Sequence, residues 1–234
     1  MSAAEARRIR SYGRRRGRKL RPARQAALDS GLASASLDAL PADGALDPRS
    51  LFTPVPRAVW LEIGFGGGEH LAWQAVSNPD VGIVGAEPFV NGVASLLAQV
   101  SRQNLHNVRV WPEDTGALLA ALADASIDRA FLLFPDPWPK ARHHKRRIVN
   151  PANLDALARV LKDGAEFRVA TDDASYLGWI LAHILDHPAF AWSVRDPEDW
   201  RVRPADWPAT RYEEKAVKNG RKPYFLSFRR RPRT

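Results

Sequence analysis

The sequence predicts an α/β protein with a doubly wound, mostly parallel sheet, and three observations support this prediction. From about residue 54 onward, short apolar runs alternate with segments whose apolar residues recur at helical spacing. The first apolar run stops at a group of glycines, which suits a tight turn from a strand into a helix. Acidic residues follow successive runs directly, at the sheet edge where folds of this kind bind ligands.

The predicted elements follow one another in regular alternation. Each strand is a short run rich in aliphatic or aromatic residues, and each helix has apolar residues three or four positions apart. The expected strands are 58–63, 81–86, 108–111, 130–134, 166–170 and 224–228. The expected helices are 67–76, 89–103, 116–122, a segment around 154–161, and 176–185. Because parallel neighbours need a crossover connection, this order favours a parallel sheet.

Charge divides the chain of 234 residues into two parts. The first 24 residues contain ten Lys and Arg and one acid, whereas the remainder contains 25 cations and 25 anions, so the net charge of +9 lies in the N-terminal segment. Residues 1–50 also lack a sustained apolar period, and we predict a basic, largely flexible arm with short helical turns before a single domain over residues 51–234. Such an arm is typical of contact with nucleic acid, and a solubilising tail is the alternative.

Several classes of protein are not expected from this composition. The sequence contains no cysteine, which excludes disulfides and thiolate metal sites and fits a reducing cytoplasm. It contains no apolar run of membrane-spanning length and no apolar signal segment near its start. The adjacent histidines His143 and His144 have no acid at ligand spacing in their loop, so we predict no metal site. The expected location is the cytoplasm.

An acid and alternating glycines mark the end of the first predicted strand. Glu62 precedes Gly64 by two residues, and Gly66 follows. Glycines at alternate positions permit positive φ and let a ligand approach the backbone closely. The sixth position counted from Gly64 is Glu69, so the dinucleotide pattern G-x-G-x-x-G does not fit, and the P-loop pattern is absent from the sequence. A carboxylate before the turn suits a cationic ligand and repels a pyrophosphate.

Acids also follow the next two predicted strands. Glu87 ends the second strand, where a carboxylate can accept hydrogen bonds from both hydroxyls of a ribose. Asp114 follows the third strand, where nucleotide-binding folds place a residue near the adenine. An N-cap of the helix that begins near Thr115 is the alternative for Asp114. The sequence therefore predicts a nucleoside-sized site at this edge of the sheet.

The fourth strand ends in a proline-rich segment that contains one acid. Prolines occupy every second position of the segment 135–139, and they should restrict Phe134, Asp136 and Trp138 to extended backbone. Asp136 is then held at the same edge as the other acids, beside the flat apolar face of Trp138. A simple proline-rich strand end is the alternative. Five cations and two histidines follow within eight residues.

This segment resembles the signature of bacterial tRNA (guanine-N7-)-methyltransferases. The match runs P-D-P-W-P-K-A-R-H-H-K-R-R over residues 135–147. Further matches are Glu62 with its glycine turn, Gly85-Ala86-Glu87, Ala170-Thr171-Asp172 and Thr210-Arg211-Tyr212-Glu213. The resemblance spans about residues 57–230 and departs at Ala86, where the family more often has a larger aliphatic residue. It implies a Rossmann-like class I methyltransferase fold, with a seven-stranded sheet and helices on both faces.

The resemblance also implies a reaction, a cofactor and a substrate. The reaction is transfer of a methyl group from S-adenosylmethionine (SAM) to N7 of a guanine in the variable loop of tRNA, which leaves S-adenosylhomocysteine. Asp136 is the implied catalytic residue and contacts the cofactor as well. The residues implied to bind the cofactor are Glu62, Gly64, Gly66, Glu87, Asp114 and Asp136.

The remaining implied residues contact tRNA. The cations Lys140, Arg142, Lys145, Arg146 and Arg147 are interpreted as phosphate contacts, with a solvated loop as the alternative. The resemblance also implies that the substrate is contacted by Asp172, Thr210, Arg211, Tyr212 and Glu213. Taken alone, Thr210 and Glu213 fit a helix capping box equally well.

Two other functions stay open at this point. One is a SAM-dependent methyltransferase that acts on something other than tRNA, which the basic arm and loop disfavour. The other is a non-catalytic RNA-binding protein with the same fold, which the acids of the predicted site disfavour. The expected partner is tRNA, with no membrane and no obligatory protein partner, and the protein is expected to be a monomer or a homodimer.

Overall fold

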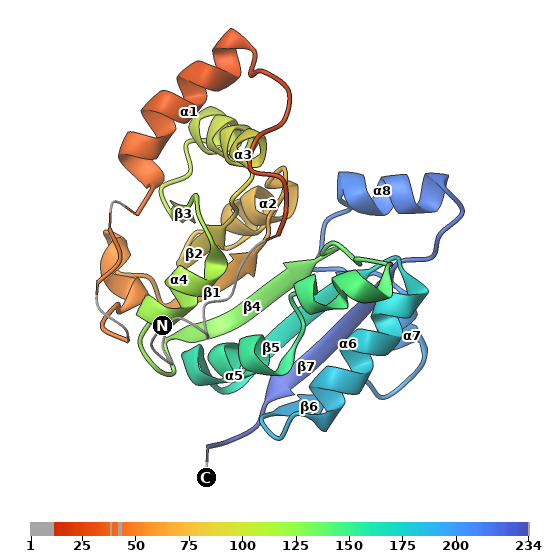
Figure 1. The fold of residues 1–234 in the computed structure, drawn as a ribbon. Helices are drawn as coiled ribbons and strands as arrows, with labels where there is room; N and C mark the ends of the chain where they lie inside the picture. The colour runs from red at the N-terminus through yellow and green to blue at the C-terminus, as the bar shows by residue number, and fades with distance from the viewer. Residues whose placement is uncertain (1–11, 38, 42–43, 234) are drawn as a thin grey trace.

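A seven-stranded sheet forms the centre of the protein. The computed structural model describes residues 12–37, 39–41 and 44–233. The strands are β1 (Ala58–Ile63), β2 (Val81–Ala86), β3 (Val108–Trp111), β4 (Ile127–Leu133), β5 (Leu161–Thr171), β6 (Phe190–Trp192) and β7 (Tyr224–Arg230). Their order in the sheet is β3-β2-β1-β4-β5-β7-β6 (Figure 1). Strands β1 to β5 pair in parallel, and β7 runs antiparallel to both β5 and β6. The predicted fold class is thus confirmed.

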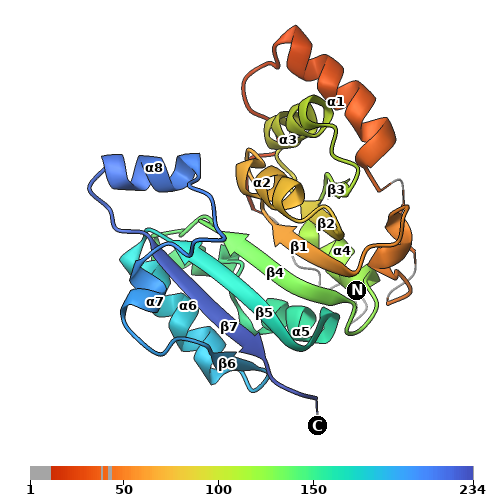
Figure 2. The ribbon, with the colours of Figure 1, turned by 180° about the vertical axis from the view of Figure 1, so that it is seen from behind.

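Helices cover both faces of the sheet, as the resemblance implied. The helices are α1 (Pro22–Ala35), α2 (Glu69–Ser77), α3 (Val90–Gln103), α4 (Thr115–Ala121), α5 (Pro151–Val160), α6 (Ala174–Asp186), α7 (Glu198–Arg201) and α8 (Arg211–Lys218). Two short 3-10 helices are η2 (Pro48–Leu51) and η3 (Ala141–Arg146). Figure 2 shows α1, α2 and α3 on one side, beside β1 and β2, with β5 and β7 open to view.

Each face of the sheet has its own apolar core, because successive side chains of a strand point to opposite faces. On β1, Leu61 and Ile63 pack with residues of α4, α5 and α6, whereas Trp60 packs with residues of α2 and α3. Glu62 lies between Leu61 and Ile63 in sequence and is only 2% exposed. The alternation therefore places the Glu62 side chain on the α2 face, although it is charged.

The strands differ from the sequence prediction at several ends and by one additional strand. Strand β4 begins at residue 127, earlier than expected, and β7 continues to residue 230. Strand β5 begins at residue 161, because α5 ends at Val160 and the chain continues directly as a strand. The short strand β6, Phe190–Trp192, was not predicted. Its three residues are too few to show a period, and its pairing with β7 depends on the antiparallel return of the chain end.

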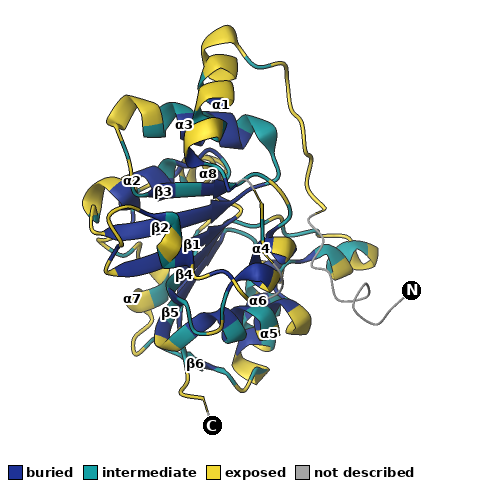
Figure 3. Ribbon diagram, turned by 90° about the vertical axis from the view of Figure 1, so that its left-hand side faces the viewer, coloured by how far each residue is buried: buried dark blue, intermediate teal, exposed yellow. Residues whose placement is uncertain are grey.

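Part of the N-terminal arm forms the helix α1, which is longer than the short helical turns expected for residues 1–50. It packs along α3 with Leu28 and Ala35 buried (Figure 3). Gly31 permits this approach, because a Cβ there would lie 2.9 Å from Cβ of Leu97. Residues 1–11, which carry three of the arm's cations, lie outside the described residues. Within the described part of the chain, no helix is long and apolar enough to cross a membrane.

Candidate active site

The carboxyl ends of β1, β2 and β4 border a cavity of about 350 Å³. Its lining includes two residues of the glycine turn, an acid after β2, and the proline-rich segment after β4. The predicted site residues in this lining are Gly64, Gly66, Glu87, Asp136, Arg146 and Tyr212. An adjoining cavity of about 310 Å³ shares Gly66 and Tyr212 and has Arg24, Arg211 and Lys215 around it.

The turn after β1 depends on its glycines. Gly64 and Gly66 have φ of 69° and 55°, which side-chain-bearing residues rarely adopt. A Cβ on Gly92, at the start of α3, would lie 2.2 Å from the backbone oxygen of Gly66. The turn is thus pressed against α3, and its backbone borders the cavity beside the ring of Tyr212.

Glu87 is fixed by the backbone around it. Its Oε2 accepts a hydrogen bond from the Gly66 N–H at 2.8 Å, and its Oε1 accepts one from the Phe89 N–H at 2.9 Å. Burial raises the pKa of Glu87, the charges of Asp136 and Glu62 add to this rise, and the two backbone donors oppose it. Each carboxylate oxygen keeps acceptor capacity beyond these bonds. Glu87 can therefore accept ligand hydroxyls from a fixed position.

Glu62 lies beside the main cavity, in the wall of a smaller one. The small cavity has a volume of about 20 Å³ and is also lined by Gly64, Thr210 and Tyr212. Oε2 of Glu62 lies 2.7 Å from Nδ1 of His70, a partner that sequence reasoning missed. The only sequence signal for His70 was a histidine near the start of a helix, four residues before Gln74 and among apolar residues. Glu62 is thus set beside the nucleoside-sized space.

The backbone of the proline-rich segment is not extended as predicted. Phe134 and Trp138 have φ of 50° and 45°, in the left-handed region, so the prediction for these two residues was wrong. Such a backbone costs on the order of 1–3 kcal/mol for each residue and persists only where surrounding contacts hold it. The Phe134 N–H donates to the Ala170 oxygen at 2.8 Å, which ties the segment to the end of β5. Asp136, between the two strained residues, is exposed at the cavity.

Arg147 departs from the predicted set of phosphate contacts. Its side chain is 2% exposed, and its Nε donates to the Pro137 oxygen at 2.8 Å. The guanidinium carbon lies 5.0 Å and 4.8 Å from the ring centroids of Tyr176 and Trp179. Arg147 therefore supports the proline-rich segment from inside the fold. The sequence prediction missed this because the residue pattern does not distinguish one buried cation from its exposed neighbours.

The other four cations of that loop differ in exposure. Lys140, Arg142 and Lys145 are exposed, as a phosphate contact requires. Arg146 is partly buried, with its guanidinium carbon 4.9 Å from the ring centroid of Trp138 and 5.6 Å from that of Tyr12. Arg146 thus borders the cavity.

The described part of the arm crosses the same cavity. Tyr12 and Arg14 belong to its lining. Beyond them, the Val90 N–H donates to the Arg15 oxygen at 3.0 Å, and Asn91 exchanges hydrogen bonds with the backbone at residues 17 and 18. Nothing in the sequence pattern pointed to this contact between the arm and the start of α3.

Several predicted residues lie outside the main cavity lining. Asp114 caps α4, with its Oδ1 accepting from the Gly116 N–H at 2.9 Å, which was the alternative interpretation. Asp172 forms an ion pair with Arg221 at 3.1 Å. The other pairs involve α8, where Thr210 accepts from the Glu213 N–H, Glu213 pairs with Arg203, and Arg211 pairs with Glu69. Among the described residues, no three His, Cys, Asp or Glu side chains gather as metal ligands would.

The known proteins to which this chain is similar are methyltransferases. A family model described as "Putative methyltransferase" matches residues 56–226. A tRNA (guanine-N(7)-)-methyltransferase of Rhodospirillum rubrum is 53% identical over 226 residues, covering 96% of this chain and 89% of that protein. One of Paramagnetospirillum magneticum is 49% identical over 231 residues, covering 98% of this chain and 96% of that protein.

Solved structures show the same fold at much lower sequence identity. The 16S rRNA methyltransferase KamB superimposes with a TM-score of 0.56 at 16% identity, over 83% of this chain and all of that chain (100%). An antibiotic-related methyltransferase superimposes with a TM-score of 0.52 at 19% identity, over 76% of this chain and 89% of that chain. At these identities the similarity concerns the fold alone.

Proposed function

Because the chain belongs to the tRNA (guanine-N7-)-methyltransferase family, we propose that its carboxyl-edge cavity binds SAM beside N7 of a variable-loop guanine. The observation that carries this proposal is that one cavity gathers Gly64, Gly66, Glu87 and Asp136 from three strand ends. These are the residues expected to hold a nucleoside cofactor and to face the reacting base. These residues lie at the edge of the sheet where ligands of such folds bind, and not in the apolar cores.

The chain's own groups fit the cofactor in three places. Glu87 accepts the ribose hydroxyls, because its two backbone donors leave acceptor capacity free. The glycine turn lets the ligand approach the backbone, and Glu62 faces the cationic amino end of the cofactor. When bound, SAM supplies a methyl group on a positively charged sulfur, and S-adenosylhomocysteine remains after transfer.

The substrate atom needs no general base. N7 of guanine has an unprotonated lone pair, which forms the new bond to the methyl carbon while the carbon–sulfur bond breaks and its electron pair stays on sulfur. Positive charge moves onto the purine during this displacement. Asp136, exposed at the cavity, stabilises that charge or orients the base. Holding N7 and the methyl carbon in line supplies most of the remaining rate enhancement.

The tRNA backbone contacts exposed cations near the cavity. Lys140, Arg142 and Lys145 follow the proline-rich segment in the chain and are exposed, and Arg211 lines the adjoining cavity. Arg147 has no part in this contact because it is buried. Phosphate contacts of this kind fix the position of the RNA without reading its sequence. Tyr212, which lines the cavity, and the partly exposed Asp172 and Glu213 are proposed to contact the substrate nearer the base, whereas Thr210 is buried as the N-cap of α8.

Transfer of labelled methyl groups from SAM to unmodified tRNA tests this function. We expect label in tRNA, located by nuclease mapping at a guanine of the variable loop, and its loss when that guanine is replaced by adenine. An Asp136→Asn variant that still binds S-adenosylhomocysteine serves as the control for background transfer. Binding of the cofactor without any labelling of RNA would contradict the proposal.

A further inference from the structure

The carboxylate of Glu62 is held by one side chain in a dry environment. Its Oε2 lies 2.7 Å from Nδ1 of His70, and each residue is 2% exposed. The rings of Phe131 and Trp207 pack against the imidazole, with centroid distances of 4.7 Å and 5.7 Å. A hydrogen bond to a charged group is strongest where water is excluded. This contact therefore fixes the position of the Glu62 carboxylate.

The far side of the imidazole fixes which nitrogen carries the proton. Nε2 of His70 lies 3.2 Å from Nε2 of Gln74, and the same Gln74 nitrogen donates to the Asp206 backbone oxygen at 2.9 Å. Oε1 of Gln74 accepts from the Asn78 amide at 3.2 Å, which sets the orientation of the Gln74 amide. An amide N–H donates and cannot accept, so Nε2 of His70 accepts. Nδ1 is then the nitrogen that carries the proton donated to Glu62.

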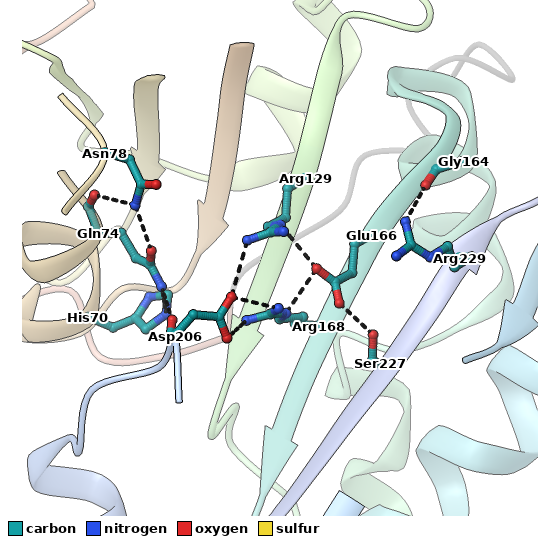
Figure 4. Close-up of polar contacts among 10 residues, drawn as sticks. All are labelled: His70, Gln74, Asn78, Arg129, Gly164, Glu166, Arg168, Asp206, Ser227 and Arg229. Atoms are coloured by element: carbon teal, nitrogen blue, oxygen red, sulfur yellow. Dashed lines mark hydrogen bonds and ion pairs between the residues drawn. The ribbon is translucent and has the colours of Figure 1, made fainter. Parts of the chain in front are cut away.

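Asp206, at the end of this chain of hydrogen bonds, is itself held in place. Arg168 donates to both of its carboxylate oxygens at 2.9 Å, and Arg129 lies 3.7 Å from one of them. Figure 4 shows the series from His70 through Gln74 to Asp206 and on to both arginines. Because Asp206 is anchored from the sheet, the Gln74 amide cannot turn over without losing its donation to the Asp206 oxygen.

A neutral His70 leaves the full negative charge on Glu62. A protonated imidazole would cancel that charge and repel a cation bound in the same place. Glu62 also lines the cavity of about 20 Å³ with Thr210 and Tyr212. That volume has room for about one group the size of a water molecule, such as an ammonium group. The arrangement therefore suits one small cation beside the nucleoside-sized cavity.

We propose that His70 is a positioning residue for the cofactor: by donating from Nδ1, it holds Glu62 as the carboxylate that binds the α-ammonium group of SAM. This inference rests on the proposed function, because it takes the carboxyl-edge cavity as the cofactor site. His70 acts only through Glu62, and the hydrogen bonds from Gln74 set its tautomer.

Two substitutions separate the two ring nitrogens. His70→Asn keeps a donor near the place of Nδ1, and His70→Gln keeps a polar group near the place of Nε2 only. Calorimetry measures the affinity of each variant for S-adenosylhomocysteine, which carries the ammonium group, and for 5′-methylthioadenosine, which lacks the amino acid part. We expect His70→Gln to bind S-adenosylhomocysteine roughly 10- to 100-fold more weakly, as for loss of a hydrogen bond to a charged group. His70→Asn should stay close to wild type, and neither variant should change the affinity for 5′-methylthioadenosine.

The outcomes distinguish this inference from the proposed function. If wild-type protein does not bind S-adenosylhomocysteine, the proposed function fails and the inference fails with it. If wild type binds but both variants match it, or if a variant loses both ligands equally, the function stands and the role of His70 is overturned. Thermal unfolding of each variant shows whether the fold is kept.

A measurement on unmodified protein makes the test independent of folding. Nitrogen-15 NMR of the labelled imidazole at neutral pH reports which ring nitrogen of His70 carries a proton. We expect a neutral ring protonated at Nδ1. A ring protonated at Nε2, or an imidazolium, would overturn the inference.

Discussion

Cavities lie at both ends of the parallel strands, and the larger of the two is not the one that gathers the acids predicted to bind a ligand. At the amino ends of β1, β2 and β3, a cavity of about 630 Å³ is lined by residues such as Phe52, Val55, Val76 and Leu105. At the carboxyl ends the cavity is about 350 Å³ but collects acids from separate strand ends. A ligand site is better identified by convergent polar groups than by its volume.

The polar groups of the two ends also differ in what they have left to bind. At the amino end, the Asn107 amide lies 2.9–3.1 Å from three backbone oxygens, so it serves the fold. Arg57 and Asp80 form an ion pair there, with both side chains more than half exposed, a type of pair that contributes little stability. At the carboxyl end, Glu87 keeps acceptor capacity after its backbone bonds. The comparison predicts that substitutions at the two ends have different effects on catalysis.

The largest expected effect is on turnover. Asp136→Asn should lower kcat by roughly 10²–10³, because it removes one preorganised charge facing the purine. Asp80→Asn is the matched control, since it makes the same chemical change at the other end of the sheet. Single-turnover methylation of tRNA measures both variants. Equal activity of the two would remove the distinction between the ends.

A smaller effect is expected on cofactor affinity at Glu87. Glu87→Ala should weaken S-adenosylhomocysteine binding by roughly 10-fold or more, as for loss of hydrogen bonds to a charged acceptor. The raised pKa of Glu87 also predicts a pH dependence. As pH falls, wild-type affinity should begin to decline above the usual range of a glutamate, and this part of the decline should be absent in the variant.

The same pKa shift makes a prediction for stability. A carboxyl whose pKa is raised by folding binds its proton more tightly in the folded state, so stability is full below the unfolded pKa and falls as pH rises through the folded pKa. Ligand-free protein should lose stability over that range in urea titrations. Stability that rises over the same range in wild type but not in Glu87→Ala would contradict the assigned shift.

The buried and the exposed cations of the basic loop should behave differently. Arg147→Met should lower the free energy of unfolding by about 2 kcal/mol, because it leaves the Pro137 oxygen without its donor and removes the contacts with two aromatic rings. Lys145→Met, the exposed control, should change stability by less than about 0.5 kcal/mol. Denaturant titration measures both, and a stability loss of the same size in both would refute the assignment of Arg147 to the fold.

The effect on tRNA binding should be the reverse and is the smallest expected. Lys145→Met should reduce the slope of log affinity against log salt by about 1, as for loss of one phosphate contact. Arg147→Met should leave that slope unchanged. Filter binding over a range of salt concentrations measures the slopes, and an unchanged slope for Lys145→Met would remove this residue from the RNA contact.

Strand ends were the part of the site most accessible from the sequence. Glu87 and Asp136 could be placed together because the carboxyl ends of parallel strands share one edge, which follows from the alternation of elements alone. The contact of Glu62 with His70 could not be predicted, since it depends on how α2 packs against β1. The sequence pattern likewise could not distinguish buried Arg147 from exposed Lys145.

Backbone conformation and weakly patterned segments were the least accessible. Prolines after Phe134 and Trp138 favour extended geometry locally, yet both residues have positive φ. The Phe134 N–H is bonded to the Ala170 oxygen, and Arg147 donates to the oxygen of Pro137, the residue before Trp138. Helix α1 has no continuous apolar face, and its packing on α3 relies on single residues such as Leu28. In the proline-rich segment, tertiary contacts outweighed the local backbone preference. In α1, the sequence has no apolar pattern from which the packing could be predicted.

A crystal structure of the complex with S-adenosylhomocysteine tests the central claim most directly. We expect the ligand in the carboxyl-edge cavity, with its ribose on Glu87, its ammonium group on Glu62 and its sulfur toward Asp136. A ligand seated in the larger cavity at the amino ends of the strands, or one that leaves Glu62 and Glu87 without contact, would contradict it.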